Sequence, residues 1–201
     1  EEFAAKLRND PRTATLPLVA LSSDHSPARI KSCHEAGFNE YITKSGQAVS
    51  MLVDVINRLF GITPESMKQG GLMMIFLSAK GGAGTSSICA NTATNIAKAQ
   101  PNARIVVADL VFPIGSIAPI VGYEGTENLI SIAEKPPLET TPDFLRNHLP
   151  KIERWNFNLL AGSPDPESSN QLNVNRIWDI VTSLKSAYDY VLVDIGRSLS
   201  K

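Results

Sequence analysis

Cysteine, the residue that forms disulfides and many structural metal sites, is scarce in this sequence. Its 201 residues include two cysteines, Cys33 and Cys89, which form neither a CxxC pair nor a Cys/His ligand spacing. This scarcity argues against a disulfide framework or a structural zinc site and favours a reducing compartment. The longest apolar run, residues 72–77, is too short for a membrane-spanning helix, and the first residues bear no resemblance to a signal peptide. We therefore expect a cytoplasmic protein.

An excess of charge of one sign is also lacking. The 19 Lys and Arg residues nearly balance the 20 Asp and Glu residues, and the formal net charge is -1. Without a global basic field we expect no specific nucleic acid as a partner, and any contact with a membrane should be local and peripheral. Hydrophobic residues make up 43% of the chain, which is enough to fill the core of one large or two small folded domains.

Residues 1–61 alternate short apolar strands with helical patterns. Their pattern predicts strands at 18–21 and 40–43, with a helix at 26–36 that stops at Gly37. A second helix follows, with an apolar stripe of Val49, Leu52, Val53, Ile56, Leu59 and Phe60. Residues 62–71 are rich in glycine and polar side chains, so we predict a linker and a domain boundary there.

The alternation of strands and helices restarts at residue 72. The apolar run 72–77 is typical of a central parallel strand because it has no polar face. Further helices are expected at 86–99 and 171–187, and further strands at 104–108, 157–160 and 190–195. This order predicts an α/β fold in which helices flank a parallel sheet.

A glycine-rich segment, Ser78–Ser87, lies between the first of these strands and its helix. This is the context that a phosphate-binding P-loop requires. Gly81, Gly82 and Gly84 leave room for backbone amides to turn inward, and the helix that follows presents free N–H groups to an anion. Ser86 is placed to ligate Mg²⁺, and Asp194, at the end of a buried strand, to support the same ion. We predict ATP and Mg²⁺ as the cofactors.

The loop departs from the general P-loop pattern in an informative way. The usual lysine position is occupied by Thr85, and the loop's one cation is Lys80, near its front. The run Lys80-Gly-Gly-Ala-Gly-Thr-Ser-Ser87 resembles the deviant Walker A loop of the MinD/ParA family. Residues 105–115 and 188–196 resemble that family's second motif and its Walker B strand, in the same order.

The resemblance implies which residues form the site. The front lysine of this family reaches across a dimer interface to the partner's nucleotide, so Lys80 is a candidate catalytic residue and a homodimer is expected. Asp109 is the second candidate catalytic residue, because it matches the first aspartate of the family's DxD motif. The predicted nucleotide-binding residues are Lys80, Gly81, Gly82, Ala83, Gly84, Thr85, Ser86 and Ser87. The predicted metal ligands are Ser86 and Asp194.

Two further segments narrow the resemblance to the CpaE/TadZ branch, which serves pilus assembly in type IVb/Flp (tad) secretion systems. Residues 157–167 are similar to that branch. Residues 1–61 resemble the C-terminal half of a response-regulator receiver, a flavodoxin-like α/β unit, with 72–201 as the N-terminal part of a MinD/ParA-like ATPase domain. By this comparison the chain is truncated at both ends. The resemblance implies pilus or secretion assembly proteins as partners and recruitment to the cell pole or the inner membrane face.

Catalysis is expected to be weak. The family's second DxD aspartate falls on Val111, and loss of such a group typically lowers a rate by ~10²–10⁴. We therefore expect a nucleotide-dependent dimer that is at most a slow ATPase. Two other interpretations stay open: a ParA-like partitioning or division-site ATPase with regular turnover, and a response regulator whose output domain is a nucleotide-free scaffold.

Overall fold

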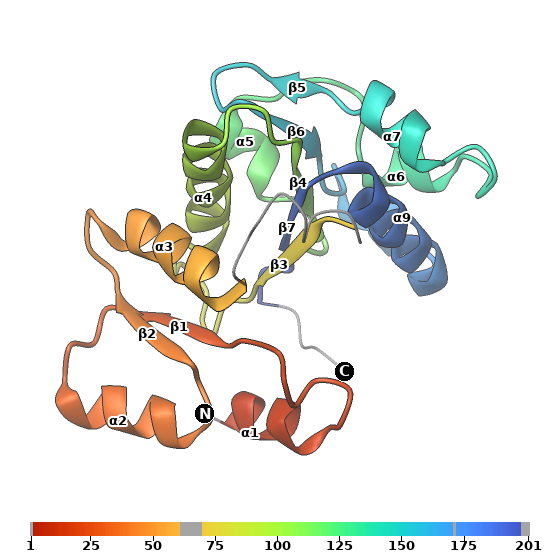
Figure 1. Cartoon of the computed structure of the whole chain (residues 1–201). Coiled ribbons are helices and arrows are strands. Elements are labelled where there is room, and N and C mark those ends of the chain that lie inside the picture. Colours follow the sequence, from red (N-terminus) through yellow and green to blue (C-terminus); the bar gives the residue numbers. More distant parts are fainter. Residues whose placement is uncertain (1, 61–69, 171, 198–201) are drawn as a thin grey trace. The chain divides into compact units, whose positions relative to one another are not determined.

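A computed structural model describes residues 2–60, 70–170 and 172–197. The chain divides into two compact units, Glu1–Ile62 and Thr63–Lys201, each of which is considered by itself (Figure 1). Of the predicted linker, residues 62–69 lie outside the described residues. No described helix is long and apolar enough to cross a membrane.

The first unit is built on a pair of parallel strands. In β1 (Val19–Ser22) and β2 (Glu40–Thr43), Val19 pairs with Glu40 and Ser22 with Thr43. The strands are joined through α2 (Pro27–Glu35), whose first turn is capped by the Ser26 side chain. The other two helices are α1 (Glu2–Asn9) and α3 (Ala48–Phe60). The predicted strands and helices of this unit are therefore present, and α1 is an additional element.

Arg8 on α1 ties this unit together. Its guanidinium donates hydrogen bonds to the carbonyls of Gly37, Ala14 and Leu16 and to the side chain of Asn39. Gly37 has a φ of 92°, and an added Cβ would lie 2.9 Å from the Arg8 Cγ atom. Glycine is thus required there both by the backbone conformation and by the close approach of Arg8.

The second unit contains a five-stranded sheet in the order β3-β7-β4-β6-β5. Its strands are β3 (Leu72–Phe76), β4 (Ile105–Asp109), β5 (Lys151–Ile152), β6 (Phe157–Leu160) and β7 (Tyr190–Asp194). Strands β3, β7, β4 and β6 are parallel, while β5 pairs with β6 in the antiparallel direction. The predicted strands of this unit are all present, and the α/β class is confirmed.

The position of β3 corrects one expectation. We predicted a central strand from its continuous apolar run, but within the described sheet β3 lies at the edge, and the Ile75 side chain is 62% exposed. The central positions belong to β4 and β7, in which every residue is buried. An apolar run indicates a strand that can be buried on both faces, but it does not show which neighbours cover it.

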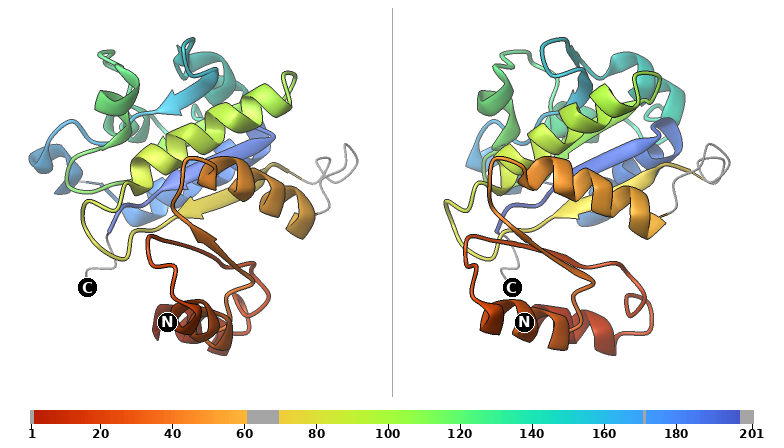
Figure 2. Two further views of the ribbon diagram at one scale, coloured as in Figure 1. Left: turned by 90° about the vertical axis from the view of Figure 1, so that its left-hand side faces the viewer. Right: turned by 60° about the vertical axis from the view of Figure 1, so that its left-hand side comes forward.

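Helices cover both faces of this sheet (Figures 1 and 2). Helix α4 (Thr85–Ala99) packs along one face, and α9 (Val174–Ala187) on the other, with α7 (Pro142–His148) packed beside it. α9 begins later than predicted because Asn173 caps its first turn. The sequence pattern missed three short helices, α5 (Ile117–Val121), α6 (Leu129–Ala133) and α8 (Pro166–Asn170), as well as α7 and β5.

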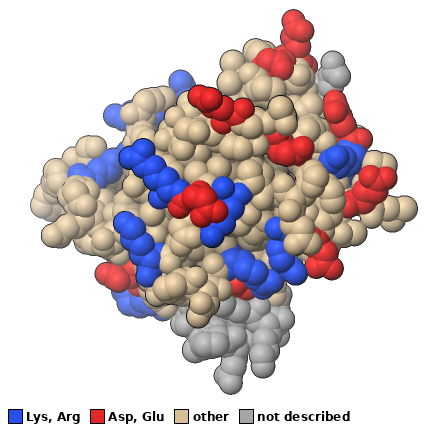
Figure 3. Space-filling view, turned by 90° about the horizontal axis from the view of Figure 1, so that it is seen from above, with Lys and Arg blue, Asp and Glu red and all other residues tan. Residues whose placement is uncertain are grey.

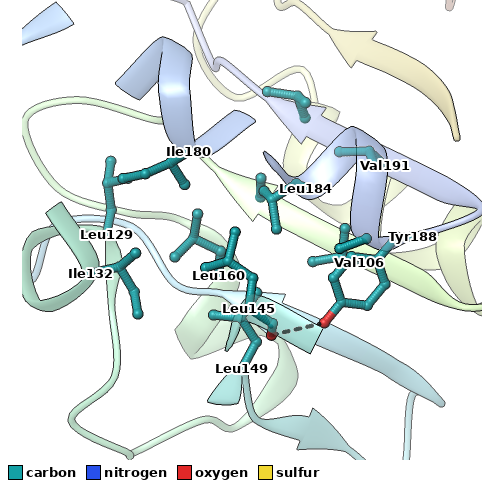
Figure 4. Close-up of a cluster of buried hydrophobic side chains, with 13 residues drawn as sticks. Val106, Leu129, Ile132, Leu145, Leu149, Leu160, Ile180, Leu184, Tyr188 and Val191 are labelled. Carbon is teal, nitrogen blue, oxygen red and sulfur yellow. Dashed lines mark hydrogen bonds between the residues drawn. The ribbon is translucent and has the colours of Figure 1, made fainter. Parts of the chain in front are cut away.

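The core beneath α9 joins the sheet to these helices (Figure 4). Ile180 and Leu184 of α9 meet strand residues such as Val106 and Val191, and all four are fully buried. The Tyr188 hydroxyl donates to the Leu145 carbonyl at 3.3 Å, which satisfies a polar group inside the cluster. Burial of such side chains stabilises the fold by roughly 1.5–3 kcal/mol each. This packing stabilises the sheet that positions the site.

Candidate functional site

The glycine-rich loop connects β3 to the start of α4. Gly82 and Gly84 have φ values of 70° and 76°, a region that favours glycine. Gly84 is the N-cap of α4, and no side chain caps that helix. A Cβ on Gly82 or Gly84 would meet no described atom within 4 Å, so there is open space above the loop. Uncapped amides beside open space form an anion site at the positive end of the helix.

Hydrogen bonds anchor the loop to the neighbouring strand. The Ser78 amide donates to the Gly196 carbonyl at 2.6 Å, and the Ile195 amide donates to the Phe76 carbonyl at 3.1 Å. Within the loop, the Ser78 hydroxyl donates to the Lys80 carbonyl at 2.5 Å. The start of the loop is thus fixed against the end of β7, where Asp194 lies.

Asp109 and Asp194 lie side by side on β4 and β7. The two residues are register partners, and both side chains are fully buried. Ala108 and Val193 face the core beneath α9. Because successive strand residues point to opposite faces, both aspartates point toward α4. The structure therefore brings together two of the predicted site residues at the carboxyl edge of the sheet, where ligands bind in open α/β folds.

The Asp194 carboxylate has one oxygen without a partner. Its Oδ1 atom accepts a hydrogen bond from the Gly196 amide at 3.0 Å, whereas Oδ2 is buried and accepts none within the described residues. An unpaired buried carboxylate oxygen is costly unless a cation or a donor completes it. This atom is the strongest indication that the site is made to receive a further group.

Asp109, in contrast, is fully engaged by the backbone. Its Oδ1 accepts from the Val111 amide at 3.1 Å, and its Oδ2 accepts from the amides of Ser116 and Ile117 at 2.6 and 2.7 Å. It thereby caps the start of α5. Burial raises the pKa of Asp109, with a further contribution from the charge of Asp194, while the three amides oppose the shift. These contacts give Asp109 a clear structural role.

The second turn of α4 lies within electrostatic range of the same two carboxylates. Burial, followed by the charges of Asp194 and Asp109, raises the pKa of the Cys89 thiol well above its usual value. Residues three apart lie on one face of a helix, so Ser86 lies on the face of α4 that Cys89 turns toward Asp194. The two predicted metal ligands are therefore on facing elements.

The other predicted loop residues differ in exposure. Lys80 and Ser87 are exposed, as are Gly81, Gly82 and Gly84, whereas Ala83, Thr85 and Ser86 are half-buried. Among the described residues, no three His, Cys, Asp or Glu side chains cluster as metal ligands. Mg²⁺ suits such a site, because it usually keeps several waters and binds through one or two protein groups and the phosphates of a nucleotide. The residues present fit an Mg²⁺-nucleotide.

The sequence pattern missed several neighbours of the site. Gly115 and Gly162 pack against Asp109: a Cβ on Gly115 would lie 2.8 Å from its Oδ2 atom, and a Cβ on Gly162 would lie 2.6 Å from the Gly115 Cα atom. Arg197 reaches the loop from beyond β7, since a Cβ on Gly81 would lie 3.7 Å from its Nη1 atom. A glycine after a buried strand was the available indication for Gly162, and nothing in the sequence indicated Arg197.

Comparison with known proteins decides the fold family. A ParA family ATPase from Chlorobium tepidum TLS superposes with a TM-score of 0.58 and 25% sequence identity, over 64% of this chain and 52% of its own. The chain contains the fold of the ParA/MinD P-loop ATPases. The kinase domain of the Escherichia coli tyrosine kinase ETK shares the fold, with a TM-score of 0.57 and 18% identity over 77% of this chain and 56% of its own.

A further match is more distant. The septum site-determining protein MinD from Pyrococcus horikoshii OT3, complexed with Mg-ADP, has a TM-score of 0.49 and 19% identity over 64% of this chain and 50% of its own. This chain thus spans about half the length of the structures that it resembles. No family model matches the sequence, and no curated protein matches it.

Charged side chains of both signs lie on the face shown in Figure 3, scattered among uncharged residues, and neither sign covers that face. That face has no continuous basic surface of the kind that holds a nucleic acid backbone.

Proposed function

We propose that this ParA/MinD-like chain binds ATP with Mg²⁺ and acts as a nucleotide-dependent dimer in which hydrolysis is slow. The observation that carries the proposal is the buried, unpartnered Oδ2 atom of Asp194 beside an open, glycine-rich helix N-terminus. Together these two features support a site for a cation next to a site for phosphates.

In this proposal, different groups of the protein bind the phosphates and the metal ion. The amides of residues 81–87 hold the phosphates, and the hydroxyl of Ser86 and the carboxylate of Asp194 hold the hydrated ion. Mg²⁺, when bound, neutralises phosphate charge. Lys80, exposed at the front of the loop, is left for the partner subunit's nucleotide.

Slow turnover follows from the chemistry that the site lacks. Asp109 already accepts three backbone hydrogen bonds, and Val111, rather than a second carboxylate, lies against Gly196. Among the groups described around this site, none is placed as a free general base for water. Binding is therefore the proposed activity, and hydrolysis a slow reset.

The sequence resemblance extends the proposal to a biological role. We propose that the protein serves type IVb/Flp (tad) pilus assembly and is recruited to the cell pole. In the source organism, a strain carrying Lys80→Ala should lose surface pili and the polar position of the tagged protein. Unchanged pili together with a defect in DNA or septum positioning would instead favour a partitioning or division-site ATPase.

The binding proposal is tested by titrating ATP into the full chain by calorimetry, with Mg²⁺ and with EDTA. Wild-type protein should bind more tightly with Mg²⁺, and Asp194→Asn should lose that preference while keeping its EDTA affinity. Asp179→Asn, at an exposed position on α9, is the matched control and should behave as wild type. Absence of ATP binding by folded wild-type protein would favour the nucleotide-free scaffold.

A further inference from the structure

The phosphate loop contains a single cationic side chain, Lys80. A general P-loop places a lysine where this chain has Thr85, at the first residue of α4. Lys80 is exposed at the front of the loop. A triphosphate carries several negative charges, which helix amides alone neutralise incompletely.

A second cation approaches the loop from the neighbouring strand. After β7 the chain turns at Gly196, which has a φ of 57°. Both the amide and the carbonyl of Gly196 form hydrogen bonds that hold this turn in place. The Gly196 amide donates to Asp194 Oδ1, and its carbonyl accepts from the Ser78 amide at 2.6 Å. The turn therefore delivers Arg197 to the start of the phosphate loop.

The Arg197 guanidinium is close to the loop and unengaged. A Cβ on Gly81 would lie 3.7 Å from its Nη1 atom, and the side chain is exposed. Within residues 2–60, 70–170 and 172–197, it forms no hydrogen bond or ion pair. An arginine that lies over a glycine loop without a carboxylate partner retains all of its donors for an incoming anion.

We propose that Arg197 binds the polyphosphate of a nucleoside di- or triphosphate in its own subunit and replaces the missing P-loop lysine. The proposal rests on the proposed nucleotide function and names an additional residue of that site. Arginine suits the role because its planar fork binds two phosphate oxygens at once. The buried Oδ2 atom of Asp194, three residues earlier, independently marks the same edge as a ligand site.

The test compares four variants of the chain with wild type by calorimetry, using Mg-ATP and inorganic tripolyphosphate as probes. Arg197→Ala should lower the affinity for both ligands about 10- to 100-fold, as expected for loss of a charge-assisted contact. Arg197→Lys should lower these affinities less, because the charge remains. Arg154→Ala is the control: Arg154 is exposed in the turn before β6, at the opposite edge of the sheet, and its loss should change neither affinity.

The fourth variant tests replacement directly. Adding Thr85→Lys to Arg197→Ala should restore at least part of the lost affinity, because it returns a cation to the standard position. Equal ATP affinity of wild type and Arg197→Ala, with unchanged thermal midpoints, would overturn the inference and leave the nucleotide function standing. A lower affinity of Arg197→Ala for ATP with an unchanged affinity for tripolyphosphate would also overturn the inference. If wild type bound neither probe, the proposed function itself would fail.

Discussion

Asp109 and Asp194 occupy matching positions on adjacent parallel strands, yet their carboxylates are used in opposite ways. Both oxygens of Asp109 are engaged by amides, whereas Asp194 keeps one buried oxygen without a partner among the described residues. Two carboxylates with the same burial and the same neighbouring helix thus take on different tasks. Asp109 organises the chain, and Asp194 is available to a ligand.

Replacing Asp109 should therefore affect stability. In Asp109→Asn an amide group replaces one carboxylate oxygen, so at least one of three converging N–H donors faces another donor. We expect the free energy of unfolding in urea to fall by about 1–3 kcal/mol. Asp179→Asn should leave it unchanged. Equal stability of Asp109→Asn and wild type would show that the amide contacts are dispensable and would return Asp109 to consideration as a catalytic group.

The close approach of two loops beside Asp109 makes Gly162 intolerant of a side chain. In Gly162→Ala the new methyl group would lie 2.6 Å from the Gly115 Cα atom and 2.9 Å from the Asp109 Cγ atom. Both neighbours are held by backbone contacts, so we expect a loss of about 1–3 kcal/mol in urea unfolding.

Gly81→Ala is the matched stability control for Gly162→Ala, since its new methyl group would make ordinary contact, 3.7 Å from the Arg197 Nη1 atom. It should unfold at nearly the wild-type urea concentration. A similar loss in both variants would point to a general cost of alanine in place of glycine.

Cys89 should make stability depend on alkaline pH. Burial raises the pKa of its thiol well above the usual value, so the unfolded chain releases this proton at a lower pH than the folded chain. The stabilisation is complete below the unfolded pKa and is lost as pH rises toward the folded pKa. The difference in unfolding free energy between wild type and Cys89→Ala should therefore shrink between pH 7 and pH 10, by roughly 1 kcal/mol or more.

The Cys89 measurement is made in urea at each pH, with a reducing agent present. Other groups that titrate in this range are common to both proteins and cancel in the difference. A difference that stays constant with pH would contradict the prediction.

Hydrolysis should respond to the residue that replaces the second aspartate of the DxD motif. Val111 lies against Gly196, since a Cβ on that glycine would lie 3.0 Å from the Val111 Cγ1 atom. In Val111→Asp a carboxylate enters the site from this position, and we expect ATP turnover to rise by ~10² when Thr85→Lys is also present. Phosphate release measures the rate. Unchanged turnover would place the limit on another step.

Lys80 should control assembly. Lys80→Ala should abolish ATP-dependent dimerisation in light scattering, because the front lysine is expected to contact the partner's nucleotide. Lys98→Ala, which removes an exposed charge from the last turn of α4, should dimerise as wild type does. ATP-dependent dimers of Lys80→Ala would contradict the role across the interface.

Sequence patterns were enough to predict the strands, the long helices and the phosphate loop. Apolar periodicity depends on neighbours a few residues apart, which is why β4, β7 and α4 were found close to their observed bounds. The glycines of the loop, Ser86 and Asp194 were likewise recognisable, because the spacing of a motif is a local property. Short helices such as α5 and α6 escaped, since five residues contain too little of a helical period.

The strand order and the use of each carboxylate depend on contacts between distant parts of the chain. Pairing between strands far apart in the chain placed β3 at the edge and set Asp109 beside Asp194. Which carboxylate keeps a free oxygen depends on amides that arrive from residues 111–117 and from Gly196. Arg197 likewise approaches Gly81 because the segments that follow β3 and β7 begin at the ends of two neighbouring strands, although they are more than a hundred residues apart in the chain.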